Sequence, residues 1–334
     1  MSAIEDLTEP ETMVCVDMGT TNTRVWLVSR DRVLARAQAQ VGVGDTARDG
    51  SNTRLRATLK GLIDEVSSGA PASSCLVAAG MITSSLGLAE VPHVDAPAGL
   101  QDLARSLQRH SFPDISELPF FFVPGVRSGP NRCQPEMIGE TDIMRGEETL
   151  CVGLIGSGLL KGPAVVLTLG SHWKAIRIDD HDRIASSVTS MSGELIHAAQ
   201  TKTILASAVP ADRASSIDRR WLDAGMEEQR RSGLPRTLFC VRLLEQKSDG
   251  TPEQRLSFLI GAFIAADLDG LIERRTLSGD YRVLITGGSA VAEGWRHALA
   301  LASIDAEVLT DGQAERGLLV GLTSVIEATG APGE

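Results

Sequence analysis

The sequence predicts an α/β protein of two domains that share one repeated unit, with an interdomain cleft. Three observations support this class. The 334 residues are enough for two domains of ordinary size. Short apolar segments of strand character alternate with segments of helical spacing. A strand, a polar turn and two further strands occur twice, about 150 residues apart, and helices follow each copy.

The first half is expected to open with three strands. Leu55, Leu59 and Leu62 have the spacing of an amphipathic helix. Five prolines between 111 and 135 predict loop and edge strand there. The elements expected in this half are strands at 13–17, 24–29 and 32–40, a helix at 52–66, a strand at 73–82 and a helix at 143–160.

The second half repeats the opening pattern and then becomes richer in helices. The elements expected here are a strand, turn and strand over 162–180, a strand at 181–190, helices at 194–207, 217–231 and 252–275, a strand at 281–290, a helix at 291–302, a strand at 306–310 and a helix at 313–328. We therefore expect an N-terminal domain over 10–150 and a C-terminal domain over 161–330.

Composition and charge exclude several functional classes. The formal net charge of −11 disfavours a broad basic surface for nucleic acid. The five cysteines are scattered and contain no CxxC pair, which argues against a disulfide framework and a structural zinc site. The first twelve residues are too polar for a secretory signal, and Asp267 and Asp269 interrupt the longest apolar segment. We expect a cytoplasmic protein without a membrane partner.

The first polar turn, in VCVDMGTTNTRVWLVSR (14–30), places Asp17 at the end of an apolar strand. A carboxylate there suits Mg²⁺ on a nucleotide, because Mg²⁺ prefers oxygen ligands and keeps several waters. Gly19 would let the backbone approach a phosphate closely, and Thr20, Thr21 and Thr23 offer donors. The alternative is an ordinary hairpin with hydroxyl and carboxyl turn caps.

The second polar turn, TLGSHWK (168–174), offers Gly170 and Ser171 to a phosphate in the same way. His172 and Lys174 alternate, so in a strand they would point to one face and could bind a phosphoryl group or an acidic substrate. The alternative is a solvent-facing strand edge.

The third turn, ITGGSAVAEGW (285–295), joins a strand to a helix. Gly287 and Gly288 precede Ser289, which is a good N-cap residue, so the helix N-terminus could border adenine or phosphate. Paired glycines are also common in turns without a ligand.

The segment MRGEET (144–149) places Glu147 and Glu148 at a helix start, next to Arg145. The two carboxylates could simply stabilise the helix N-terminus. One of them could also act as a general base, which requires hydrogen-bond reach to the attacking hydroxyl. The order of these four signals is that of the actin, hexokinase and heat-shock ATPase class, in which two hairpins grip the phosphates.

The chain resembles the 2-dehydro-3-deoxygalactonokinase family, which has actin-like (ribonuclease H-like) domains. The MRGEET run and the AGMI segment are the most distinctive parts of the resemblance. The matching stretches are VDMGTTNTRVWL (16–27), AAGMITSSLGLAEVPHVDAPA (78–98), IMRGEET (143–149), LGSHWK (169–174), SGEL (192–195), FCVR (239–242) and LIGAFIAADL (259–268). Leu169, Ser171, Ala175 and Met18 depart from the family pattern.

The resemblance implies phosphorylation of the 6-hydroxyl of 2-dehydro-3-deoxy-D-galactonate by ATP with Mg²⁺. It implies that Glu148, or failing it Glu147, is the general base, with Asp142 a third candidate, and that Asp17 holds the Mg²⁺ water shell. The phosphate and nucleotide residues would be Gly19, Thr20, Thr21, Gly170, Ser171, Gly287, Gly288 and Ser289. The sugar-acid residues would be Arg24, Ser84, Ser85, Arg145, His172, Lys174 and Arg242. A homodimer is expected from the same resemblance.

Two other functions remain open at this point. An exopolyphosphatase-type hydrolase of the same superfamily shares the Gly-x-Glu-Glu element and attacks with water. A non-catalytic sensor of a sugar acid and a nucleotide is the alternative from another class.

Overall fold

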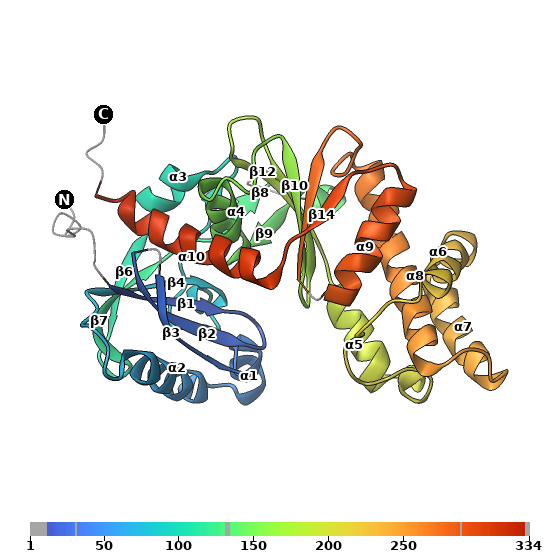
Figure 1. Ribbon diagram of the computed structural model, residues 1–334, viewed down its shortest axis with the longest axis horizontal. Helices are drawn as coiled ribbons and strands as arrows, with labels where there is room; N and C mark the ends of the chain where they lie inside the picture. Colours follow the sequence, from blue (N-terminus) through green and yellow to red (C-terminus); the bar gives the residue numbers. More distant parts are fainter. Residues whose placement is uncertain (1–11, 31, 131–133, 288, 331–334) are drawn as a thin grey trace. The chain divides into compact units, whose positions relative to one another are not determined.

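The structure is a computed structural model, and it describes residues 12–30, 32–130, 134–287 and 289–330 (Figure 1). The chain forms two compact units. Unit 1 contains the chain up to Lys161, Asp180–Ser186 and the chain from Gly312 onward. Unit 2 contains Gly162–Asp179 and Ser187–Asp311. The C-terminal helix therefore lies in unit 1, whereas the sequence led us to expect it in a domain over 161–330.

Unit 1 is built on a six-stranded sheet of order β3-β2-β1-β4-β7-β6. The first strand pairs antiparallel with β2 and parallel with β4. Both central strands, β1 and β4, are buried almost throughout, which is typical of strands covered on both faces. The strands are β1 Met13–Met18, β2 Thr23–Ser29, β3 Arg32–Ala39, β4 Cys75–Gly80, β6 Gln108–Phe112 and β7 Ser116–Phe122.

Helices cover both faces of this sheet. On one face, α2 (Thr53–Ser67) buries Leu55 and Leu59 against the core that contains Val14 and Val16. The short helix α1 (Val43–Asp49) precedes it. Figure 1 shows α10 (Asp311–Glu327) on the opposite side of the sheet from α2.

A second, three-stranded sheet in unit 1 has the order β5-β8-β9. It leads directly into α4 (Glu147–Gly156). The remaining elements of this region are η1 Met81–Thr83, β5 Val94–Asp95, α3 Leu100–Arg105, β8 Val126–Ser128, η2 Pro135–Glu140 and β9 Asp142–Met144.

Unit 2 is built on a five-stranded sheet of order β12-β11-β10-β13-β14. Its longest helix, α8 (Pro252–Glu273), is apolar along most of its length and lies in the core of this unit. The strands are β10 Ala164–Leu169, β11 Trp173–Ile178, β12 Ile184–Ser190, β13 Arg282–Gly287 and β14 Ala306–Val308. The other helices are α5 Ser192–Lys202, η3 Ile204–Ser207, α6 Arg219–Ser232, α7 Leu234–Gln246 and α9 Ser289–Leu301.

The duplication expected from the sequence is confirmed in the strand order. The run β3-β2-β1-β4 in unit 1 corresponds to β12-β11-β10-β13 in unit 2. In unit 1, β1 and β2 form an antiparallel hairpin, and β4 pairs parallel with β1. In unit 2, β10 and β11 form an antiparallel hairpin, and β13 pairs parallel with β10. Each hairpin therefore ends next to the carboxyl end of a parallel strand, which is where ligands bind in open α/β sheets.

Several local expectations were wrong. The proline-rich region was expected to be loop and edge strand, but β7 lies between β4 and β6, because Pro119 falls outside its pairing with β4. The helix expected over 143–160 begins only at Glu147, after β9. The sequence analysis also missed α7, whose Pro235 stands in the first turn, where a helix tolerates proline.

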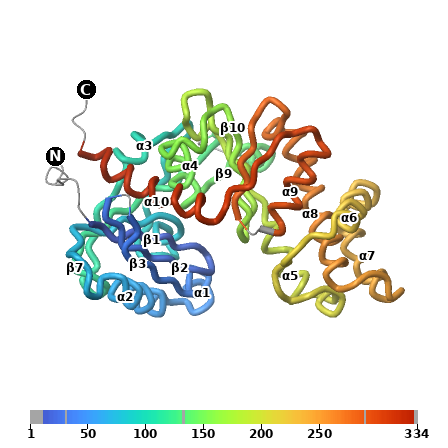
Figure 2. Tube along the Cα trace, in the orientation of Figure 1, coloured from blue at the N-terminus to red at the C-terminus, as the bar shows by residue number. Residues whose placement is uncertain are grey.

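Glycine permits a close contact between two helices that are far apart in the sequence. Figure 2 shows α4 and α10 side by side within unit 1. A Cβ on Gly153 would collide with the backbone oxygen of Gly317, and it would stand 2.5 Å from the backbone nitrogen of Gly321. The backbones therefore touch, and no side chain fits at this crossing.

We predict that Gly153→Ala lowers the free energy of unfolding by about 1–3 kcal/mol, because an overpacked backbone contact must be pushed apart. The matched control is Gly156→Ala on the same helix, where the new Cβ would meet a valine methyl at 3.4 Å. Chemical denaturation of both variants measures the difference. Equal stability of the two variants would show that the crossing tolerates a methyl group.

Candidate active site

The first polar turn is a hairpin that joins β1 to β2, as the sequence predicted. Asp17 and Arg24 are register partners across it. The Arg24 guanidinium donates to Asp17 Oδ2 from Nε at 3.0 Å and from Nη2 at 2.6 Å. The Asp17 side chain is 17% exposed and that of Arg24 is 45% exposed. Asp17 was expected to hold Mg²⁺ and Arg24 to bind the sugar acid. In the structure the two side chains form one ion pair next to the turn of the hairpin.

Two glycines stand beside the other oxygen of Asp17. A Cβ on Gly80, at the end of β4, would lie 3.4 Å from Asp17 Oδ1, and a Cβ on Gly146, before α4, would lie 3.8 Å from it. Both glycines have a positive φ, 88° at Gly80 and 107° at Gly146. The ends of β1 and β4 and the start of α4 thus meet around one carboxylate, and glycine keeps that space open.

The tip of the first hairpin rests on the N-terminus of α1. Val43 N donates to Gly19 O at 3.2 Å, and Gly44 N donates to Thr20 O at 2.8 Å. A Cβ on Gly42 would stand 2.5 Å from both of these carbonyl oxygens. Asp45 Oδ2 accepts from Gly42 N at 3.0 Å, and this hydrogen bond lowers the pKa of the Asp45 carboxyl. The sequence analysis missed this support.

The threonines of the tip differ in accessibility. Thr20 and Thr21 are exposed, and neither hydroxyl bonds to another described residue. Thr23, in contrast, is buried and donates to Val41 O at 2.7 Å. Thr20 and Thr21 are therefore available to a ligand, whereas Thr23 secures the hairpin.

The acidic helix start lies next to this hairpin. Glu148 is fully buried, and both of its carboxylate oxygens accept from Gly146 N at 2.8 Å. Glu147 is half-buried. Asp142 lies on β9, before this helix. Gly146 therefore lies between the two carboxylates, because its amide donates to Glu148 and a Cβ on it would lie 3.8 Å from Asp17 Oδ1.

Arg145 binds the segment that follows β4. Its Nη1 donates to Thr83 Oγ1 at 2.9 Å and its Nη2 donates to Val91 O at 2.8 Å. His93 Nδ1 lies 3.4 Å from Nη2. Burial lowers the pKa of the Arg145 guanidinium, whereas the carboxylates of Glu148 and Glu90 raise it.

The two serines chosen as substrate contacts also lie in this segment. Ser84 is half-buried, and its hydroxyl donates to Met81 O at 2.7 Å, whereas Ser85 is exposed. Thr83 and His93 were missed, although both lie in the stretch that resembles the family.

The second polar turn is a hairpin that joins β10 to β11. Its tip rests on the start of α5, since Glu194 N donates to Ser171 O at 2.7 Å. His172 Nε2 lies 3.1 Å from Glu194 Oε2. Lys174 lies within β11 and is only 5% exposed. His172 and Lys174 therefore do not form one exposed cationic face, because Lys174 is buried in the strand whereas His172 belongs to the turn.

The third turn meets the second hairpin in unit 2. Gly287 is the register partner of Leu169 across the parallel pair β10–β13, and its φ is 109°. A Cβ there would stand 2.6 Å from Leu169 O. Gly288 lies outside the described residues, and Ser289 is the first residue of α9.

Arg242 has a separate environment on α7. It forms an ion pair with Glu245 of the same helix, and its Nη1 donates to Ser207 Oγ at 3.1 Å. These contacts link α7 to η3. Arg242 was expected to bind the sugar acid because it lies in a motif that resembles the family. In the structure its guanidinium pairs with Glu245 of the same helix.

The donor set suits a hydrated cation better than an enclosed one. Among the described residues, no three histidine, cysteine, aspartate or glutamate side chains gather into a metal cage. Mg²⁺ on a nucleotide needs only one or two carboxylates, together with phosphates and waters. Asp17, with its open glycine surroundings, fits that requirement.

The duplicated hairpins and sheets define an α/β protein of the actin-like class of kinases and ATPases. A solved structure of a Sinorhizobium meliloti protein assigned to the 2-dehydro-3-deoxygalactonokinases matches with a TM-score of 0.75 and 24% identity, over 96% of this chain and 98% of that chain. An activator of 2-hydroxyisocaproyl-CoA dehydratase from Clostridium difficile, solved with bound ADPNP, matches with a TM-score of 0.50 and 12% identity, over 95% of each chain.

The chain belongs to the 2-keto-3-deoxy-galactonokinase family, whose family model matches residues 17–322. A protein of Rhizobium meliloti (strain 1021), named a probable 2-dehydro-3-deoxygalactonokinase, is 31% identical over 262 residues, which are 76% of this chain and 80% of the relative. The 2-dehydro-3-deoxygalactonokinase of Escherichia coli (strain K12) is 24% identical over 322 residues, covering 94% and 97%. The family inferred from the sequence is confirmed, and it is a family of carbohydrate kinases.

The helices of the described part of the chain do not include one with the length and apolar character to cross a membrane.

We predict that Gly42→Ala lowers kcat/KM at least ten-fold, because the new methyl group would push the carbonyls of Gly19 and Thr20 out of place. A kinase assay measures the loss. The control is Gly61→Ala in α2, where a Cβ meets nothing within 4 Å. Wild-type activity in Gly42→Ala would show that the hairpin tip does not depend on this contact.

Proposed function

We propose that the protein transfers the γ-phosphoryl group of ATP to the 6-hydroxyl of 2-dehydro-3-deoxy-D-galactonate. Family membership across 17–322 and the names of two relatives support this reaction. The observation that carries it is the meeting of Asp17, Gly80 and Gly146 in unit 1. The bound ADPNP of the dehydratase activator supports a nucleotide on this fold. Because ATP is a cytoplasmic metabolite, the proposal places the protein in the cytoplasm.

Two hairpins act on the phosphates in this proposal. From the first hairpin, Thr20 and Thr21 present backbone amides and hydroxyls, and Gly19, whose amide donates to Asn22 O within the turn, lets the backbone approach closely. Gly170 and Ser171 present the same groups from the second hairpin, and Gly287 and the start of α9 border the nucleotide. Such transfer depends mainly on positioning and on charge neutralisation, so these fixed donors supply most of the effect.

Asp17 is the proposed ligand of a hydrated Mg²⁺. Bound Mg²⁺ would neutralise charge that develops on the phosphate oxygens. Arg24 holds Asp17 Oδ2 and so leaves Oδ1 toward the glycine-lined space. Arg24 was expected from the sequence to bind the sugar acid. In this proposal it orients the Asp17 carboxylate.

Cations of unit 1 would bind the carboxylate of the sugar acid. Arg145 is the best candidate, because it contacts the segment of Thr83 and Ser84 and carries a partly buried charge. Its guanidinium and the hydroxyls of this segment would orient the substrate. His172, Lys174 and Arg242 remain proposed substrate contacts of unit 2, with weaker support, since Arg242 binds Glu245.

The general base is assigned to Glu148. The Gly146 amide holds its carboxylate beside the space around Asp17. The base would accept the proton of the 6-hydroxyl as that oxygen attacks phosphorus, while the bond to the ADP oxygen breaks. Glu147 and Asp142 are the other carboxylates of this region.

We predict that ADP forms only when a 2-keto-3-deoxy sugar acid is present. A coupled assay over 2-keto-3-deoxy-galactonate, 2-keto-3-deoxy-gluconate and related acids measures this dependence and ranks the substrates. A phosphohydrolase would release ADP equally without the acid, and a sensor would bind both ligands without turnover. Either outcome would reject the kinase reaction.

Asp17→Asn is expected to lower kcat about 100-fold and to raise the Mg²⁺ concentration needed for half-maximal rate, since a neutral amide is a weaker Mg²⁺ ligand. Mg²⁺ titration of the ATP-dependent rate measures both effects. Asp114→Asn is a matched control, because Asp114 also pairs with an arginine of unit 1, Arg56, at the surface. An unchanged Mg²⁺ dependence in Asp17→Asn would remove the metal assignment.

Glu148→Gln is expected to lower kcat by 100-fold or more while the KM for the sugar acid changes little, as expected for loss of a general base. Glu147→Gln and Asp142→Asn should keep most of the activity. Thermal melting establishes that all three variants fold. The assignment moves to Glu147 if only that variant loses turnover.

A further inference from the structure

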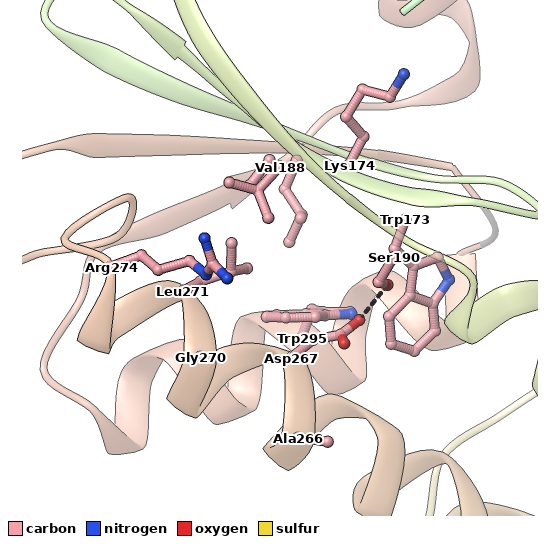
Figure 3. Close-up of a pocket in the computed structure, with 12 residues that line it drawn as sticks. Trp173, Lys174, Val188, Ser190, Ala266, Asp267, Gly270, Leu271, Arg274 and Trp295 are labelled. Carbon is pink, nitrogen blue, oxygen red and sulfur yellow. Dashed lines mark hydrogen bonds between the residues drawn. The ribbon is translucent and has the colours of Figure 1, made fainter. Parts of the chain in front are cut away.

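A half-buried aspartate in unit 2 joins two sequence motifs to which the proposed reaction gives no role. Asp267 lies on α8 in the segment LIGAFIAADL, and Ser192 begins α5 in the segment SGEL. Asp267 Oδ2 accepts from Ser190 Oγ at 2.5 Å and from Ser192 Oγ at 2.8 Å. Figure 3 shows the bond from Ser190, whose side chain turns from the sheet toward α8. One oxygen thus connects the end of β12 and the start of α5 to the core helix.

The start of α5 is also the support of the second hairpin. After Ser192, a Cβ on Gly193 would collide with the carbonyl oxygen of Gly170, and it would stand 2.8 Å from that of Ser171. Glu194 N donates to Ser171 O at 2.7 Å. The hairpin tip therefore lies directly on the residues that follow Ser192, and any shift of α5 must move the tip.

The surroundings of Asp267 argue against a mere packing role. Its carboxyl lines a pocket of about 160 Å³ together with Trp173 and Trp295. These two indoles meet edge to face at a centroid distance of 5.6 Å. Burial raises the pKa of the Asp267 carboxyl, whereas the two serine hydroxyls lower it. A carboxyl that is partly removed from water is costly unless hydrogen bonds compensate it, and here two serine hydroxyls do so.

We propose that Asp267 is a positioning residue that fixes the second phosphate hairpin through Ser192 and the start of α5. The inference rests on the proposed role of this hairpin in binding the phosphates of ATP. Asp267 touches neither substrate in this arrangement. It holds β12 and α5 in one register, so that Gly193 and Glu194 present a fixed surface to the tip at 170–172. Loss of this anchor should weaken the nucleotide site more than the sugar-acid site, whose main proposed residue, Arg145, lies in unit 1.

Asp267→Ala tests the proposal. We expect the KM for MgATP and the Kd for ADP to rise about ten-fold, because charged hydrogen bonds that order the tip are lost. The KM for the sugar acid should rise much less than the KM for MgATP, because its main proposed contact, Arg145, lies in unit 1. Asp267→Asn should recover most of the nucleotide affinity, since its amide oxygen can accept from the same two serines. Ser192→Ala should show a smaller rise in the same two constants.

Asp269→Ala is the matched control, because Asp269 lies two residues further along α8 and pairs with Arg230 at the surface. It should leave all constants unchanged. Wild-type nucleotide affinity in both Asp267→Ala and Ser192→Ala would overturn the proposal, and so would an equal rise in both KM values. If Asp267→Ala does not fold, Ser192→Ala and Asp267→Asn carry the test.

The ADP affinity is measured by calorimetry and needs no turnover. A wild-type protein that binds ADP but phosphorylates no sugar acid would therefore reject the proposed reaction and leave the role of Asp267 measurable. A wild-type protein that phosphorylates the acid, with Asp267→Ala equally active at low ATP, would reject the role of Asp267 alone.

Discussion

The close approach of two parallel strand ends is the constraint on which each unit depends. Gly80 stands beside Met18 at the end of β1, and Gly287 stands beside Leu169 at the end of β10. A Cβ would lie 2.5 Å from the Met18 carbonyl oxygen in the first case and 2.6 Å from that of Leu169 in the second. Both glycines have a positive φ, so a side chain there would meet strain as well as a collision. In unit 1 this approach brings the start of α4 to Asp17, and in unit 2 it brings Gly287, the last residue of β13, to the start of the second hairpin.

The two units stabilise their hairpins in the same way with different residues. In unit 1, the start of α1 supplies Gly42 and the amides of Val43 and Gly44 to the tip. In unit 2, the start of α5 supplies Gly193 and the amide of Glu194. In both units a tip carbonyl accepts a hydrogen bond from a helix N-terminus, so the tip is held from outside its own hairpin. Each tip needs this outside support, because a short turn by itself is mobile.

The charged side chains divide between building the site and serving a ligand. Arg24 orients Asp17. Arg145 binds the segment after β4, and its guanidinium is partly buried there. Arg242 binds Glu245 and Ser207 on the surface of unit 2. A positive charge in a matched motif is therefore not by itself a substrate contact. Arg145 is the strongest of the three as a proposed substrate contact, because it lies in the segment after β4, where Thr83 Oγ1 accepts from it and Ser84 follows along the chain.

The sequence by itself determined the fold class, the duplication, the order of the two hairpins and the family. Apolar periodicity and turn chemistry are local properties, and they predicted β1, β2, α2, α8 and β13 well. The sequence could not determine which residues support the site, because Gly42, Gly193 and Asp267 act on segments that are distant along the chain. It also missed α7 and expected loop and edge strand around Pro119, where β7 is an inner strand, since a local breaker does not show which backbone groups need partners. Only the tertiary structure decided that Glu148 turns toward Gly146, that Lys174 is buried, and that the last helix packs on α4, because each depends on the close packing of backbones from different parts of the chain.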